Sequence, residues 1–281
     1  MKEKYKYVFV VLVYKNTDVL TTFFESMQKI DDKKVILVNS YYDDDSLARC
    51  KDAAMANGAD FIPVPNRGFG AGNNRGIEYA KEHYEFDYLV LSNSDIIIRT
   101  WAKAEELPSG ASVIAPQTRM LTGKNQNPNI PYYPAVGLWL HKQYVRTENK
   151  RFLDIAHILS RGGREVFLLY SRLFKKNRYK IFSVHGSFML FSSEALDRLM
   201  PVFDERIFLY NEEGYLACKC RHLNIPCYYC PAIQVTHLEG ASSHGTMISE
   251  EYMKSLKILM QVRGEKDYFH GVEERESITK N

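Results

Sequence analysis

NRGFGAGNNRGIEYAKEHYEFDYLVLSNSD, residues 66–95, is the stretch around which the rest of the chain is organised. It begins with a glycine-rich turn, whose three closely spaced glycines allow a bulky neighbour to approach the backbone. A short apolar helical stripe follows, and then an apolar run at 88–91 that is typical of a strand buried on both faces. Asp95 stands just beyond that strand, where open α/β sheets bind their ligands. A carboxylate there can hold a divalent cation against phosphate oxygens, so the stretch predicts a nucleotide-binding site.

Composition narrows the classes of protein to consider. The 281 residues are 45% hydrophobic and 25% charged, which suits a large globular domain or a domain with an appendage. A net charge of +3 is too slight to indicate nucleic acid, and we expect none as a partner. Five cysteines favour a reducing compartment over a disulfide framework, so we expect a cytoplasmic protein. The apolar run at 8–13 is too short for a signal peptide, and no run approaches the roughly 20 residues of a membrane span.

Strand and helix patterns alternate through the first 115 residues. We expect strands at 7–14, 35–38, 61–64, 88–91 and 112–115. Helical apolar spacing lies between successive strands, including a short predicted helix at 101–107. This rhythm predicts an α/β fold with a mainly parallel sheet and helices on both faces.

The pattern changes after Pro116. Residues 116–140 are rich in Pro, Asn, Gly and Tyr and predict an ordered loop or irregular hairpin. Residues 141–180 are strongly basic and carry interleaved apolar stripes. Their cations are Lys142, Arg146, Lys150, Arg151, Arg161, Arg164, Arg172, Lys175, Lys176, Arg178 and Lys180. Two interpretations stay open: contact with an anionic membrane surface, or a helical insertion packed on the core with a solvated cationic rim.

The second half returns to α/β patterns. We expect a strand at 182–191 and a helix at 193–200, then an acidic turn that leads into another helix. A short strand at 227–230, a final amphipathic helix at 247–262 and a loose polar tail after Gly264 complete the chain. The glycine-rich turn follows the third strand, whereas a dinucleotide fingerprint follows the first, so a dehydrogenase is a weak interpretation. A turn whose glycines merely relieve strain remains an alternative.

Several motifs in order resemble one enzyme family. NRGFGAGNNRGIEYA followed by DYLVLSNSD is similar to the inverting glycosyltransferases of family 2, particularly the rhamnosyltransferase-like branch. HGSFMLF and FDERIFLYNEEGYLACKCRHLNIPCYYCPAIQVTHLEGAS resemble later motifs of that branch, so the match covers roughly 7–115 and 182–245. The resemblance implies a GT-A fold with a Rossmann-like, mainly parallel mixed sheet.

The domain boundaries follow from this resemblance and from the change in composition. A single GT-A domain would span 1–264, followed by a polar tail at 265–281. Within it we expect a nucleotide-sugar half at 1–115, a loop with a basic amphipathic insertion at 116–181, and an acceptor and catalytic half at 182–264.

The resemblance also implies a set of site residues. The candidate donor ligands are Tyr14, Asn39, Asp44, Asn66, Gly68, Gly72, Asn73, Arg75 and Asn93. Asn39 stands where relatives have an Asp that contacts the nucleobase, and its amide oxygen can still accept from an imino N–H. Asp95 and His237 are the candidate ligands of a divalent metal, Mg²⁺ or Mn²⁺. Asn93 replaces the first acid of the family's Asp-x-Asp pattern.

Inverting transfer needs a base that takes the proton of the acceptor hydroxyl. Glu213, and with less support Glu212, matches the carboxylate pair that the family uses, although two acids at a helix N-terminus also stabilise that helix. His185 and Gly186 are candidates for the acceptor cleft.

The resemblance implies transfer of a sugar, L-rhamnose from dTDP-rhamnose as the first choice. The acceptor would be a hydroxyl of a growing, lipid-linked bacterial surface polysaccharide such as capsule or O-antigen, at the cytoplasmic face of the membrane. Alternatives are another UDP- or dTDP-sugar donor, a nucleotide-binding module without catalysis, or a zinc-stabilised nucleic-acid-binding or scaffold protein. The last would use the cysteines at 218, 220, 227 and 230, but the first two point to different faces of a helix, which disfavours zinc.

Overall fold

The computed structural model describes residues 2–238 and 247–264, and its first half is a parallel α/β unit. The strands are β1 (Glu3–Val13), β2 (Lys33–Ser40), β3 (Asp60–Val64) and β4 (Tyr84–Asn93), and every pairing among them is parallel. The helices are α1 (Leu20–Ser26), continued by the 3₁₀ turn η1 (Met27–Lys29), α2 (Asp44–Ala56) and α3 (Phe69–His83). Asp43 begins α2 as a capping residue, because its carboxylate accepts the Ser46 N–H at 2.8 Å.

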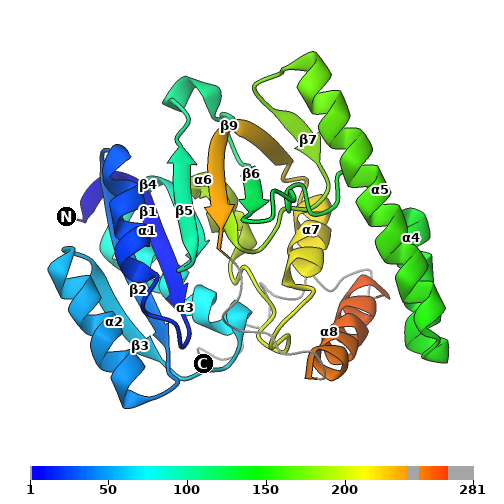
Figure 1. Cartoon of the computed structure of the whole chain (residues 1–281), viewed down its shortest axis with the longest axis horizontal. Helices are drawn as coiled ribbons and strands as arrows, with labels where there is room; N and C mark the ends of the chain where they lie inside the picture. The colour runs from blue at the N-terminus through cyan, green and yellow to red at the C-terminus, as the bar shows by residue number, and fades with distance from the viewer. Residues whose placement is uncertain (1, 239–246, 265–281) are drawn as a thin grey trace, which may run out of the picture.

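The second half adds antiparallel neighbours to this sheet. Its strands are β5 (Ile96–Thr100), β6 (Val113–Met120), β7 (Tyr179–Ile181), β8 (Phe188–Ser192) and β9 (Cys227–His237). Its helices are α6 (Ser193–Leu199), α7 (Glu212–His222) and α8 (Met247–Gly264). The described strands form one mixed sheet in the order β3-β2-β1-β4-β8-β6-β9-β5, with β7 paired to β9 (Figure 1).

Helices cover both faces of the sheet, as the sequence predicted. One apolar cluster packs α1 and α2 against one face, through residues such as Phe23 and Cys50. The other cluster packs α3, α6 and α7 against the opposite face, through residues such as Ile77, Leu196 and Leu216. The central strands are apolar on both faces because both faces are covered.

The predicted basic insertion is a helical hairpin. It consists of α4 (Ala135–Thr147) and α5 (Lys150–Phe174), which lie along one edge of the molecule (Figure 1). Phe167 and Leu168 of α5 are buried against the core, and Tyr144 of α4 packs with α7 and α8. No helix of residues 2–238 or 247–264 is long and apolar enough to cross a bilayer.

Several predicted elements are wrong in their extent. Of the single strand expected at 182–191, only the last part is a strand, β8; residues 182–187, including His185, form the loop between β7 and β8. The helix expected at 101–107 is only the 3₁₀ turn η2 (Ala104–Glu106), and β5 was not expected. The strand expected to stop at 115 continues through Pro116 to Met120.

The strand expected at 227–230 is also longer, since β9 runs on to His237 with a register shift beside Pro116. The final helix is confirmed as α8. The tail at 265–281 and the Gly-x-Ser at 240–242 lie outside the described residues.

The topology brings the carboxyl ends of six strands, β1, β2, β3, β4, β6 and β9, to one edge of the sheet. β1 and β4 are parallel, and β8 is antiparallel to both β4 and β6, so β6 runs in the direction of β4. β9 is parallel to β6 and ends at the same edge. Residues that follow β4, precede β8 and end β9 therefore meet there, although they are far apart in the sequence.

Candidate active site

Two of the predicted metal ligands meet at this edge. Asp95 occupies the turn between β4 and β5, and His237 is the last residue of β9. The His237 Nε2 lies 3.2 Å from the Asp95 Oδ1, and both side chains are largely buried. β5 pairs antiparallel with β9 so that Ile96 stands opposite His237, and the Leu238 N–H donates to the Asp95 carbonyl. The pairing of strands therefore places this pair of side chains together.

The second nitrogen of the His237 ring is also held. Its Nδ1 lies 2.9 Å from the Oε1 of Gln126, a residue of the loop after β6. An Arg164 Nη1 donates to the Gln126 carbonyl at 3.4 Å, so the insertion contributes a cation beside the pair. Burial lowers the pKa of Arg164 from its ordinary value. From the sequence, Arg164 was one cation of a segment expected either at a membrane surface or on a solvated rim, and Gln126 had no role, because only the folded chain brings them to His237.

The arrangement fits a divalent cation. Carboxylate oxygen and imidazole nitrogen are ligands of Mn²⁺, and oxygen is the usual ligand of Mg²⁺. Adjacent ligands of an octahedral ion bound at about 2.1 Å are about 3 Å apart, close to the 3.2 Å between Asp95 and His237. The described residues hold no group of three or more His, Cys, Asp or Glu side chains poised around one metal. These two side chains would therefore share an ion with phosphate oxygens or water.

His185 and Gly186 lie between the metal pair and Glu213. The rings of His185 and His237 are 6.2 Å apart. The Gly186 N–H donates to the Glu213 Oε1 at 3.0 Å, and a Cβ on Gly186 would approach that oxygen to 2.8 Å. Burial lowers the pKa of His185 to about 4, against the opposing effect of the Glu213 charge. The structure thus brings together the predicted acceptor, metal and base residues.

Glu212 and Glu213 begin α7 in different environments. Glu212 is 4% exposed, and its Oε1 has no hydrogen-bond partner. Burial, and then the charge of Glu213, raises the pKa of Glu212 to about 8. Glu213 is partly exposed to the cavity beside it. Environments that differ in this way separate the roles of two neighbouring carboxyl groups.

The turn before α7 sets the position of Glu212 and Glu213. Tyr210 and Asn211 both have positive φ values, 70° and 67°, which are uncommon for residues other than glycine. The Asn211 Nδ2 donates to the Ser255 Oγ of α8 at 3.1 Å, which anchors the turn. Backbone strain of this kind is often kept at functional sites. The sequence carried no signal for it beyond the Asn itself.

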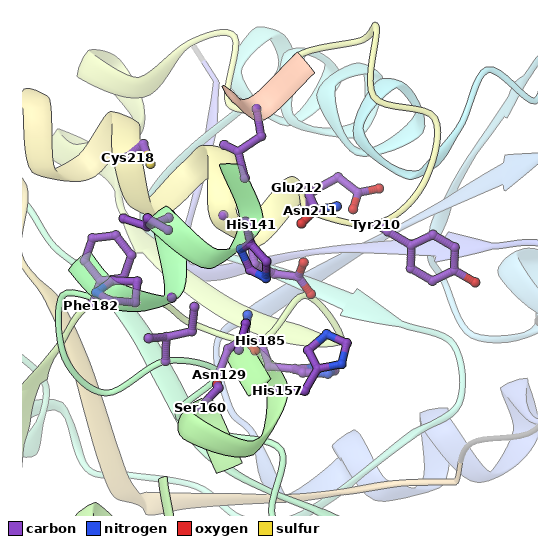
Figure 2. Close-up of a pocket in the computed structure, with 18 of the residues that line it drawn as sticks. Asn129, His141, His157, Ser160, Phe182, His185, Tyr210, Asn211, Glu212 and Cys218 are labelled. Atoms are coloured by element: carbon purple, nitrogen blue, oxygen red, sulfur yellow. The ribbon is translucent and has the colours of Figure 1, made fainter. Parts of the chain in front are cut away.

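A cavity of about 710 Å³ opens beside Glu213. Asn93, His185 and Gly186 line its inner end. Figure 2 shows Tyr210 and Asn211 of the turn before α7, and Glu212 at the start of α7, around the same pocket as residues of α4 and α5. The labelled residues of α4 and α5 are His141, His157 and Ser160. Burial lowers the pKa of His141 to about 4. The insertion predicted as a peripheral segment therefore builds a wall of the candidate site.

The glycine-rich turn contacts the protein itself. The position of a Cβ on Gly68, whose φ is +102°, lies 2.3 Å from the Phe208 carbonyl oxygen, and on Gly72 it lies 2.6 Å from Leu12. The N–H of Phe69 donates to that same carbonyl, and the N–H of Gly68 to the Asn66 side chain. The neighbours that Gly68 and Gly72 admit on this side are the loop 203–208 and strand β1, and the expected contact of these two glycines with a donor stays a prediction.

Two further donor candidates are engaged elsewhere. Arg75 forms ion pairs with Glu78 at 2.5 Å and Glu205 at 2.7 Å, so an open phosphate-binding guanidinium is not what the structure shows. The buried Asn73 donates to the Phe69 carbonyl within α3. Asn93 differs, because it lines the cavity at the end of β4 and its N–H donates to the Ser187 carbonyl.

The candidates for the nucleobase lie at the neighbouring part of the edge. Asn39, the last but one residue of β2, has no exposed surface, so it offers none to a base in this structure. Tyr14 and Tyr42 contact edge to face at 5.7 Å, and the Lys15 ammonium lies over both rings. Asp44 accepts from the Tyr41 hydroxyl at the start of α2. Their contacts with a donor stay predictions.

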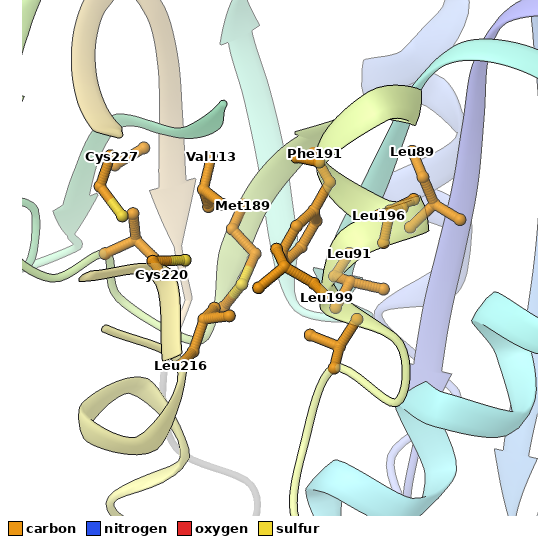
Figure 3. Close-up of a cluster of buried hydrophobic side chains, with 14 of the residues drawn as sticks. Leu89, Leu91, Val113, Met189, Phe191, Leu196, Leu199, Leu216, Cys220 and Cys227 are labelled. Atoms are coloured by element: carbon orange, nitrogen blue, oxygen red, sulfur yellow. The ribbon is translucent and has the colours of Figure 1, made fainter. Parts of the chain in front are cut away.

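The cysteines are distributed over different environments. All five are free thiols, and Cys218 lines the cavity. Cys220 and Cys227 lie in the apolar core beside Val113 and Met189 (Figure 3). The hydrogen bond with Cys227, and then burial, raises the pKa of the Cys220 thiol, which keeps it protonated. As part of the core they pack as small apolar residues do.

Comparison with known proteins supports the fold. No family model and no curated protein matches the sequence. The solved structure of GalNAc-T7 with UDP, GalNAc and Mn²⁺ is similar over 90% of this chain and 48% of that one, with a TM-score of 0.56 and 10% identity. The mannosyltransferase PcManGT from Pyrobaculum calidifontis, with GDP-Man and Mn²⁺, has a TM-score of 0.48 and 13% identity over 86% and 59%. TarS of S. aureus has 0.49 and 15% over 80% and 36%.

The likeness to GalNAc-T7 bears on the fold alone. The chain spans less than two thirds of the length of each of these proteins. Its fold is the mixed α/β fold of GT-A glycosyltransferases, which confirms the fold that the sequence predicted. Membership of family 2 and of the rhamnosyltransferase-like branch stays a prediction.

Proposed function

We propose that this protein is a metal-dependent glycosyltransferase that moves a sugar from a nucleotide diphosphate to an acceptor hydroxyl with inversion. The observation that carries the proposal is the contact of Asp95 with His237 at the edge of the sheet. His185 and Gly186 link this pair to Glu213, which lies beside the cavity. The solved GalNAc-T7 structure, which has the same fold, contains UDP and Mn²⁺, and this supports a nucleotide donor and a divalent ion.

The residues divide into three tasks. Asp95 and His237 would hold the cation, and Arg164 adds positive charge beside them. When bound, the cation offsets the negative charge that develops on the departing nucleoside diphosphate. Asn93 and Gly186 lie between these groups and the cavity, where the sugar would sit.

Glu213 is the proposed general base. Its Oε1 is fixed by the Gly186 N–H, and its side chain reaches the cavity that would admit the acceptor. Attack by the acceptor hydroxyl on the anomeric carbon breaks the bond to the diphosphate, and Glu213 takes the hydroxyl proton. Glu212, with its raised pKa, would stay protonated near neutral pH and serve as a neutral neighbour.

The identity of the substrates is also a proposal. dTDP-L-rhamnose is the first choice of donor and other dTDP- or UDP-sugars are the alternatives, on the resemblance of the sequence motifs. The acceptor would be a glycan or lipid-linked glycan of a bacterial surface polysaccharide, reached from the cytoplasmic side. The apolar lining that α4 and the preceding loop 129–134 give to the cavity supports an acceptor with an apolar part.

A thermal-shift panel of dTDP-, UDP- and GDP-sugars with and without Mn²⁺ tests donor binding. A ligand that binds the native state raises the unfolding midpoint, and we expect one nucleotide class to do so only with the metal. Asp95→Asn should abolish the metal-dependent part of the shift. Absence of any shift across the panel would refute the nucleotide-sugar proposal.

Glu213→Gln then separates binding from chemistry. We expect the donor-induced shift to persist while transfer falls by about 10²- to 10⁴-fold, because Gln cannot accept the proton. Glu82→Gln, at an exposed position of α3, is the matched control and should leave transfer unchanged. Full transfer by Glu213→Gln would rule out Glu213 as the base.

A further inference from the structure

We propose that α5 is a docking surface for an anionic lipid bilayer. The proposal concerns a face of the insertion that packs on nothing in the described part of the chain, and it goes beyond transfer chemistry. The occupant is a membrane leaflet that contains acidic phospholipids. Two features of α5 carry the argument: an apolar stripe that stays exposed, and cations at both ends of that stripe.

The apolar stripe runs along most of α5. Its members are Ile155, Ile158, Leu159, Val166, Leu169, Leu173 and Phe174, all of them exposed. Val166 is 65% exposed and Leu173 69%, so these side chains are not rim residues of the core. Positions 155, 159, 166 and 173 recur at helical spacing, and the stripe from 155 to 174 is about 30 Å long. A contiguous apolar face of this length in water indicates an interaction site.

The charged residues beside the C-terminal end of the stripe are all cationic. The exposed cations there are Arg172, Lys175, Lys176, Arg178 and Lys180. No acidic residue occurs between 166 and 182, and none of these cations forms an ion pair with any described residue. Lys150 and Arg151 place positive charge at the other end. An amphipathic helix of this composition fits the interface of an anionic bilayer, where each cation near the surface adds to the attraction.

The same charges argue against a second copy of the chain on this face. In a two-fold dimer built on α5, the helices would pack parallel or antiparallel. In a parallel pair Arg172, Lys175 and Lys176 of one copy would face the same cations of the other, and in an antiparallel pair they would face Lys150 and Arg151, which Asp154 only partly offsets. Like charges at an interface disfavour the complex. A lipid surface with negative head groups supplies the complementary charge.

The stripe is continuous with the mouth of the cavity. Leu159 belongs to the exposed stripe and also lines the cavity. The exposed Tyr132 and Val136, at the start of the insertion, line the same cavity. A bilayer in contact with α5 would therefore lie beside the opening through which an acceptor enters. This orientation rests on the proposed function, whereas the binding of lipid itself does not.

Vesicle flotation tests the surface without any catalytic readout. The full chain is mixed with phosphatidylcholine vesicles, or with the same vesicles containing phosphatidylglycerol. We expect flotation only with the anionic vesicles. Leu169→Glu with Leu173→Glu should weaken binding at least about tenfold, since both side chains would otherwise be buried among acyl chains. Met55→Glu, 71% exposed on α2 at the far end of the molecule, is the matched control and should bind as the unchanged protein does (Figure 1).

A second pair of variants tests the charges. Lys175→Glu with Lys176→Glu should weaken binding to anionic vesicles, and so should added salt. Lys51→Glu with Lys29→Glu makes the same change in net charge away from α5 and should have a small effect. Far-UV circular dichroism and the unfolding midpoint verify that each variant is folded.

Three results would overturn the proposal. One is the absence of flotation with anionic vesicles; another is equal flotation with both kinds of vesicle. The third is a dimer in light scattering without lipid that Leu169→Glu with Leu173→Glu converts to a monomer, which would assign the stripe to a second copy. None of these results depends on sugar transfer, so a protein without donor binding can still satisfy the test.

Discussion

Replacing Glu212 with glutamine tests whether a neutral carboxyl group is built into the start of α7. Glu212 is almost completely buried, with one oxygen unpartnered, and its pKa is raised to about 8 by burial and by Glu213. A glutamine has nearly the same shape and carries no charge at any pH. It therefore mimics the protonated form of Glu212 and removes its titration.

The sign of the pH dependence follows from the two pKa values. In the unfolded chain Glu212 loses its proton near its ordinary value of 4.5, but in the folded chain it keeps the proton up to about pH 8. Between these values the folded protein binds more protons, so its stability falls as pH rises. One pKa unit corresponds to about 1.4 kcal/mol, so the loss at pH 8 is at most about 4 kcal/mol. Water that reaches the turn after a small rearrangement would reduce this figure.

Denaturant unfolding of the unchanged protein and of Glu212→Gln at pH 5 and pH 8 measures the effect. We expect similar free energies of unfolding at pH 5. At pH 8 the variant should be more stable, by up to the figure above. Glu82→Gln, on the exposed face of α3, controls for removal of a surface carboxylate and should follow the unchanged protein at both values.

The reasoning would be refuted if the two free energies differed by the same amount at pH 5 and pH 8. It would also fail if Glu212→Gln were the less stable protein at pH 8. Either result would mean that Glu212 is ionised in the fold. The division of tasks between Glu212 and Glu213 would then lose its physical basis.

Further predictions concern the packing of α3 and of the insertion. Gly68→Ala should destabilise by more than about 2 kcal/mol in denaturant unfolding, because φ is +102° and the new methyl group would meet the Phe208 carbonyl. Gly58 also has a positive φ, +62°, but no atom lies near an added Cβ, so Gly58→Ala should cost only about 1 kcal/mol of unfolding free energy. Equal losses of stability for Gly68→Ala and Gly58→Ala would disprove the clash with Phe208. Asn74→Ala should cost about 2–4 kcal/mol, since it leaves two buried backbone groups without partners; a neutral result would contradict this. Gly162→Ala, with no neighbour near the added methyl group, should stabilise by about 0.5–1 kcal/mol, and a lower unfolding midpoint would contradict that.

Much of the architecture was readable from periodicity. The alternating apolar runs and helical stripes of the first 100 residues correspond to β1–β4 and α1–α3, because a strand covered on both faces must be apolar throughout. Asp95 could be placed from the sequence, since it directly follows such a strand. Boundaries failed where local signals conflicted with pairing: β6 continues through Pro116 because β9 runs beside it, with a register shift at that point.

The glycine-rich turn shows the limit of a motif. Its spacing indicated close approach of a bulky neighbour but not which neighbour, and the structure assigns that place to Phe208, Phe203 and Leu12 of the same chain. The donor role expected of Gly68 and Gly72 stays a prediction. No local pattern in the sequence reports which distant segment will pack against a glycine backbone.

The sequence by itself determined that this chain is an α/β protein, that an acid follows its fourth strand, and that a basic amphipathic segment interrupts it. These features depend on residues near one another in the chain, whose periodicity and order are visible directly. Only the tertiary structure decided that Asp95 meets His237, that Gly186 holds Glu213, and that the insertion walls the cavity with its apolar stripe outward. Those contacts depend on strand register and on the packing of segments that are distant in the sequence, and no local sequence pattern reports either of them.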